Sequence, residues 1–208
     1  MNLSHPSKLN IKSSLVVPAS LALLLTCSAD LLADDVSDQI DEAVKAYEKE
    51  DYNTAITALD SASTLIRQKK GALVSKLPPE PLDDWQADES KSSAAAAGMY
   101  GGGISAERRY TRKTDGNTET ITISITTDSP LIQTMGMMFS NPMFMGQDNK
   151  LLVINGEKTI ANERDNSLTS MIANKVMVKI DGNKQVAAEA LKEYFKSIDF
   201  KAIKEYAQ

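Results

Sequence analysis

The order of apolar and polar positions predicts two amphipathic helices in the first part of the chain. Between Asp34 and Lys70, apolar residues return after three or four positions, which is the spacing of one face of an α-helix. The pattern breaks between Glu48 and Asn53, so we expect two helices that form a hairpin over residues 34–75. The apolar positions are Val36, Ile40, Ala43, Val44 and Tyr47, and then Tyr52, Ala55, Ile56, Leu59, Ala62 and Ile66. We expect these faces to cover each other and then either the following domain or a second copy of the chain. The alternative is a groove that binds a peptide.

From residue 104 onward the pattern changes to the two-residue period of β-strands. Ile121, Ile123 and Ile125 alternate with threonine and serine, which predicts a strand with one buried and one polar face. We therefore predict an α+β protein, in which the helical hairpin is followed by an antiparallel sheet packed with helices over residues 104–208.

Turn residues place the ends of these strands. The pairs Asp115-Gly116 and Asn155-Gly156 lie between strand-like segments, and such pairs are typical of tight hairpins. Residues 168–180 predict one long strand or two short ones. Beyond Asn183 the apolar residues return to helical spacing, so we expect the chain to end in helix.

The segment between the hairpin and the sheet, residues 76–103, has the composition of a linker that leads into a strand. Three prolines between Lys76 and Leu82 exclude helix and impose an extended backbone. Trp85 is expected to anchor the core where the first strand begins. The small, glycine-rich run Ala94–Gly103 lacks the lysine and the following helix of a phosphate-binding loop, which leaves a mobile loop or a tight strand entry as the expected structure.

Both parts of the chain resemble known families. Residues 43–62 resemble one tetratricopeptide (TPR) unit, with Ala43 at the small position of the first helix and Asp51-Tyr52 at the turn. Residues 77–200, with a Pro-x-x-x-Trp motif that ends at Trp85, resemble the PsbP-like fold of small secreted and envelope proteins. The combination is similar to exported proteobacterial proteins that join a helical region to such a domain. The resemblance implies a binding or accessory role without catalysis.

The first 33 residues have the layout of a secretory signal peptide. Two lysines precede the apolar segment 15–26, which is too short to remain as a transmembrane helix. Cleavage after Ala29 or after Ala33 would release a protein without a membrane span. In the alternative, Cys27 ends a stretch that resembles a bacterial lipobox and would carry a lipid anchor. Either way we expect an exported protein, in the periplasm or anchored in the envelope of a Gram-negative bacterium.

Composition excludes several classes of function. The only histidine and the only cysteine, His5 and Cys27, lie in the export segment. A chain cleaved after Ala29 or Ala33 therefore lacks the residues of Ser-His-Asp and Cys-His catalysis and of nearly all zinc and haem sites. We expect no cofactor. The net charge of −5 does not provide the basic surface that nucleic-acid binding requires.

Five methionines lie close together between Asp128 and Gly146. Asp128 or Ser129 can cap a helix with Pro130 in its first turn, and Asn141-Pro142 would end it. Methionine fills irregular apolar gaps and adaptable binding surfaces, so the segment is expected to pack in the core or to form a docking surface. The residues of that binding surface are Met135, Met138, Phe139, Met143, Phe144 and Met145.

Two forms of chemistry stay open as alternatives. Thioether sulfur suits Cu(I), and the ligands would be Met135, Met137, Met143 and Met145. A hydrolase would need two carboxyl groups in one pocket, from candidates such as Asp83, Asp84, Glu107, Glu119 and Glu163, and nothing in the sequence pairs them. The function predicted first is therefore that of a non-enzymatic binding or scaffold protein without catalytic residues. Its partner is expected to be an envelope protein or a second copy, bound through the helical hairpin.

Overall fold

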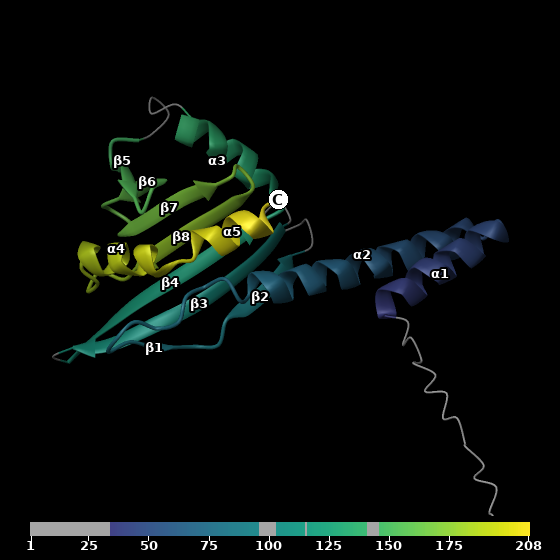
Figure 1. Ribbon diagram of the computed structural model, residues 1–208, viewed down its shortest axis with the longest axis horizontal. Helices are drawn as coiled ribbons and strands as arrows, with labels where there is room; N and C mark the ends of the chain where they lie inside the picture. Colours follow the sequence, from purple (N-terminus) through teal and green to yellow (C-terminus); the bar gives the residue numbers. More distant parts are fainter. Residues whose placement is uncertain (1–33, 96–102, 115, 141–145) are drawn as a thin grey trace, which may run out of the picture. The chain divides into compact units, whose positions relative to one another are not determined.

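The computed structural model of the 208-residue chain describes residues 34–95, 103–114, 116–140 and 146–208 (Figure 1). Its first elements are helices α1, Asp35–Glu48, and α2, Tyr52–Val74. Each begins at an aspartate whose carboxylate accepts a hydrogen bond from a backbone N–H of the first turn, Asp34 from Val36 and Asp51 from Thr54, both at 3.2 Å. The predicted break therefore coincides with a capped turn.

The described strands form one antiparallel sheet of eight strands. They are β1 Gln86–Ala87, β2 Lys91–Ala95, β3 Gly103–Thr114, β4 Asn117–Thr127, β5 Asn149–Ile154, β6 Glu157–Asn162, β7 Ser167–Ile172 and β8 Val176–Gly182. Their order is β1-β3-β4-β8-β7-β6-β5, and β2 pairs with the same edge of β3 as β1 does. Since β1 and β2 lie within residues 76–103, the predicted linker itself contributes two strands to the sheet.

Left-handed backbone conformations close the predicted hairpins. Asn155 and Gly156 have φ angles of 52° and 80° between β5 and β6, as a tight two-residue turn requires. Ala173 and Asn174 have φ angles of 49° and 55° between β7 and β8. The segment that the sequence predicts as one strand or two is therefore two strands with a turn.

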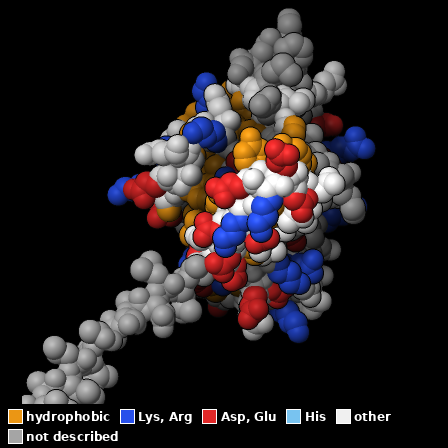
Figure 2. All heavy atoms as spheres, turned by 90° about the vertical axis from the view of Figure 1, so that its right-hand side faces the viewer, with side chains coloured by type: hydrophobic (Ala, Val, Ile, Leu, Met, Phe, Trp, Pro, Cys, Tyr) orange, Lys and Arg blue, Asp and Glu red, His pale blue; other side chains and the backbone are white. Residues whose placement is uncertain are grey.

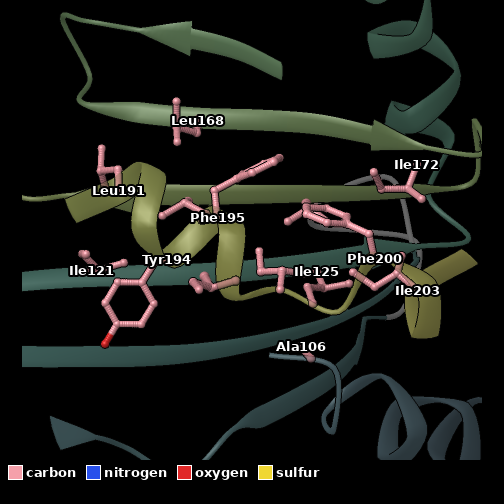
Figure 3. Close-up of a cluster of buried hydrophobic side chains, with 14 of the residues drawn as sticks. Ala106, Ile121, Ile125, Leu168, Ile172, Leu191, Tyr194, Phe195, Phe200 and Ile203 are labelled. Carbon is pink, nitrogen blue, oxygen red and sulfur yellow. The ribbon is translucent and has the colours of Figure 1, made fainter. Parts of the chain in front are cut away.

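Two C-terminal helices, α4 Ala188–Ser197 and α5 Phe200–Tyr206, lie along the sheet (Figure 1). Their buried side chains meet the apolar face of β4, where Ile121, Ile123 and Ile125 are fully buried. Figure 3 shows Tyr194 and Phe195 of α4 pointing toward the strands, with Phe200 and Ile203 of α5 beside them. This layer of side chains is the core of the protein.

An aromatic cluster joins the start of the sheet to α4. The rings of Trp85 and Tyr194 meet edge to face at 5.2 Å, and Tyr110 lies 4.6 Å from Tyr194. The guanidinium of Arg112 stacks 4.6 Å above the Trp85 ring, and its Nε lies 2.6 Å from the Glu119 carboxylate. Trp85 is thus buried in the core, as an anchor would be.

The α+β prediction is confirmed, because a helical pair precedes an antiparallel sheet that helices cover. The TPR-like and PsbP-like resemblances stay predictions.

Candidate docking surface

Small residues hold the two helices of the hairpin together. Ala43 and Ala46 of α1 face Ala55, Ala58 and Ala62 of α2, and all five are buried. Alanine allows two helix backbones to approach closely and uses little side-chain volume at the contact. The helices therefore meet without using their larger apolar residues.

Those larger apolar residues form what we term the hairpin face. Each residue advances about 100° around a helix, so they all lie to the same side of the alanine contact on their own helix. The two helices run antiparallel, as the Asp34–Lys69 ion pair at one end and the Tyr47–Tyr52 ring contact of 5.9 Å at the other indicate. Each helix carries its large apolar residues at a similar angle from its own alanines. Because the helices run antiparallel, these two rows of residues lie on one side of the hairpin. The hairpin face consists of Ile40, Val44, Tyr47, Tyr52, Ile56, Leu59 and Ile66.

The hairpin face is open to solvent. Its seven residues are between 42% and 67% exposed, so a large part of each is open to solvent. Figure 2 looks onto the end of the molecule that carries α1 and α2, where hydrophobic side chains are visible beside a band of acidic and basic ones. Contiguous exposed apolar surface of this kind marks interaction sites in soluble proteins. The sequence pattern predicts that the following domain or a second copy covers these residues, and in the described chain the following domain leaves them exposed.

The last turns of α2 are fixed to the sheet. Val74 is fully buried in the core, and a Cβ on Gly71 would lie 3.4 Å from the Ser92 hydroxyl of β2. Lys70 donates to Asp128 at 2.5 Å, and this hydrogen bond raises the pKa of the Lys70 ammonium. One continuous helix of 23 residues thus carries part of the hairpin face at its start and enters the core at its end.

Charge is unevenly distributed along the hairpin. The turn between the helices carries Glu48, Glu50 and Asp51 with only Lys49 among them, whereas α2 carries Arg67, Lys69 and Lys70 near its other end. Lys69 pairs with Asp34, and Lys70 pairs with Asp128. Arg67 makes no ion pair with any residue that the structure describes. The turn of the hairpin is therefore acidic, whereas its opposite end combines Arg67 and Lys69 with Asp34, Asp35 and Asp38 of α1.

The helix predicted in the methionine segment is present as α3, Pro130–Ser140. Ile132 is buried, and Met135 and Phe139 are half-buried. The side chains of Met137 and Met138, and the whole of residues 141–145 with Met143, Phe144 and Met145, lie outside the described residues. The structure therefore places only Met135 and Phe139 of the predicted binding surface, and only Met135 of the four Cu(I) ligands.

A hollow of about 600 Å³ lies where α3 begins, beside the end of α5. Lys70, Asp128, Lys175 and Tyr206 contribute polar groups to it. The ammonium of Lys175 donates to the Ala207 carbonyl at 2.7 Å, and burial raises the pKa of the Tyr206 hydroxyl. The two lysines of the hollow thus already have partners within the chain.

Three of the candidate carboxylates of a hydrolase lie apart from one another. Glu119 is buried on the core face of β4 beside Arg112, whereas Glu107 is exposed and lies on the other face of the sheet. Glu163 pairs with Lys150 at the surface. Among the residues that the structure describes, no three His, Cys, Asp or Glu side chains are grouped so that they could hold a metal ion.

Comparisons with known proteins found no matching family model, no similar curated protein and no similar solved structure. Within the described ranges, no helix has both the length and the apolar character that crossing a membrane requires.

Proposed function

We propose that this chain is an exported, non-enzymatic binding or scaffold protein of the Gram-negative envelope, and that it acts through the hairpin face. The observation that supports the proposal is the exposure of seven large apolar residues on one side of the hairpin. The sequence supplies the export segment, and it lacks histidine and cysteine beyond that segment.

The arrangement of small and large residues favours binding over packing. A hairpin that served only to cover the sheet would turn its large residues inward, because each buried Leu, Ile or Phe contributes about 1.5–3 kcal/mol. Here Ala43, Ala46 and Ala58 occupy the inner contact, and Ile56 and Leu59 face solvent. The sheet has a separate core built from α4 and α5, which does not involve the hairpin face. The hairpin face is therefore available to a partner.

In vivo photo-crosslinking tests this role. A photoreactive phenylalanine analogue would replace Tyr47, which is 67% exposed on the hairpin face, in the full chain produced with its own leader. We expect a defined covalent product after irradiation of intact cells. The change Ile56→Glu on the same face should abolish that product, because a carboxylate would be buried at the contact.

The matched control carries the same analogue at Val153, which is 71% exposed on strand β5. Non-specific contact with neighbouring proteins would yield a crosslinked product at Val153 as well as at Tyr47. A product that forms equally at Val153, or no product at Tyr47, would contradict the proposed role.

A further inference from the structure

We infer that the occupant of the hairpin face is the hairpin face of a second copy of this chain, so that two hairpins form an antiparallel four-helix bundle. The inference rests on the proposed binding role and specifies its partner. It is supported by the exposed area, by the position of the large apolar residues on one side of both helices, and by the acidic charge of the hairpin turn.

The exposed area matches what a stable dimer requires. Seven side chains that are each about half exposed offer on the order of 100 Å² apiece, or ~700 Å² per copy, close to the ~800 Å² per partner of a standard interface. A single added helix would contact only the middle of a face that spans both α1 and α2. A second hairpin has the same width and length, and it would cover both rows at once.

The chemistry of the hairpin face suits a copy of itself. It contains aliphatic residues at its centre, Ile56 and Leu59, and two tyrosines near the turn, Tyr47 and Tyr52. Aliphatic and aromatic side chains in helical rows are the residues that pack between helices of a bundle. The buried alanines hold the helices of each hairpin together, so two preformed hairpins could join without refolding.

Charge favours a bundle in which the two hairpins point in opposite directions. In that arrangement the acidic turn of one copy, with Glu48 and Asp51, lies beside the end of the partner that carries Arg67. If both hairpins pointed the same way, the two acidic turns would lie together and repel each other. The opposed arrangement also places Tyr52 of one copy near Ile66 of the other.

An anionic lipid surface fits the hairpin face less well. Helices that lie on such membranes carry lysine and arginine on their polar side. The polar side of α1 instead carries Asp35, Asp38, Asp41, Glu42 and Glu48 against Lys45. Anionic headgroups would be repelled by this helix.

Sedimentation analysis of the purified full chain provides the first test. We expect a dimer with a dissociation constant in the micromolar range or tighter. Ile56→Glu should weaken dimerisation at least ~100-fold, because symmetry places two carboxylates in the contact. Leu59→Ser should weaken it less. Val153→Glu, at a more exposed apolar residue on β5, should leave it unchanged. Circular dichroism would verify that each variant keeps its helices.

A chain that is monomeric at all concentrations, or a dimer that Ile56→Glu does not weaken, would overturn the inference. The Tyr47 photoproduct separates this result from failure of the proposed function. A product that joins two copies supports both the dimer and the proposed binding role. A product with a different protein contradicts the dimer and leaves the binding role intact. Binding to vesicles of anionic phospholipid that Ile56→Glu abolishes would also overturn the dimer.

Cysteine crosslinking tests the orientation. In a Cys27→Ala background, chains with Tyr52→Cys would be mixed with chains with Ile66→Cys and oxidised. We expect disulfide-linked heterodimers at a higher yield than Tyr52→Cys homodimers. A higher yield of Tyr52→Cys homodimers would show that the acidic turns lie together, which contradicts the opposed bundle.

Discussion

Lys70, on the last third of α2, donates to the carboxylate of Asp128 at 2.5 Å, 58 positions away in the sequence. Asp128 has a φ of 55° and lies between strand β4 and helix α3. The pair therefore ties the helix that carries the hairpin face to the turn from which the methionine segment begins.

Asp128→Asn tests the energy of this pair. Asparagine tolerates the positive φ, so the change removes the charge and keeps the backbone. Both side chains are more than a third exposed, so we expect the free energy of unfolding to fall by less than ~1 kcal/mol. The folded pKa of Lys70 is raised, so the pair stabilises the fold below the unfolded pKa of about 10.4 and loses that effect as pH rises further.

Urea unfolding at neutral pH and near pH 11 would measure both effects. The difference between the natural chain and Asp128→Asn should shrink at the higher pH. Glu163→Gln, which breaks the exposed Lys150 pair, provides the control for loss of a surface charge. A difference that grows with pH would contradict this account of the pair.

We expect ionisation of Tyr194 to contribute to the loss of folding stability at alkaline pH. Burial raises the pKa of its hydroxyl to about 12, so the folded chain holds this proton more tightly than the unfolded chain does. Stability from this group is complete below pH 10 and is lost as pH rises through 12. Tyr194→Phe removes the group, and we expect stability to fall less steeply between pH 10 and 12 than it does in the natural chain.

The readout is the urea midpoint at several pH values. Tyr52→Phe, on the exposed hairpin face, serves as the control and should leave the alkaline slope unchanged. If Tyr194→Phe kept the natural slope, Tyr194 ionisation would not contribute to alkaline unfolding.

The alanine contact predicts a steric effect within the hairpin. Ala58→Leu would force a larger side chain between α1 and α2, and such overpacking costs about 1–3 kcal/mol. We expect lower helical content by circular dichroism and a lower melting temperature. Ala72→Leu, exposed on the same helix, should change neither.

Phe195 is the most informative core position. It is fully buried in α4 and its ring lies 4.9 Å from that of Phe200. Phe195→Ala should lower the free energy of unfolding by about 3–5 kcal/mol, because it removes buried surface and leaves a cavity. Lys196→Ala on the exposed side of the helix is the control, and denaturant titration of both variants gives the comparison.

The mature amino terminus tests the proposed export and distinguishes the two processing routes. We expect intact-mass measurement to give a chain that begins at Asp30 or Asp34, as signal peptidase cleavage would produce. A chain that begins at Cys27 with attached acyl groups would instead establish a lipoprotein. Cys27→Ala would then release the protein from the membrane fraction.

Most of the fold could be predicted from local patterns in the sequence. The alternation around Ile123 and the Asn155-Gly156 pair each specify strands or turns through neighbouring residues alone, and the structure has them where the sequence predicts them. Pairing between distant segments could not be read in this way. The short strands β1 and β2 have no strong alternation of their own, and only their hydrogen bonds to β3 define them.

The candidate site was harder to predict for a related reason. Helical periodicity identifies apolar positions but does not show whether Ala58 or Leu59 forms the inner contact, since both fit the same spacing. Side-chain size was the available signal, because alanines recur at Ala55, Ala58 and Ala62 on one row. The Lys70–Asp128 pair has no local signal, because its partners meet only through the fold.

The unbroken course of α2 means that the hairpin cannot be removed as an independent module. A deletion of residues 34–75 would take Val74 out of the hydrophobic core and expose the Ile104 end of β3. A truncated sheet would therefore be unstable for reasons unrelated to partner binding. Loss of function in such a truncation would say nothing about the hairpin face, whereas point changes at Ile56 or Leu59 isolate it.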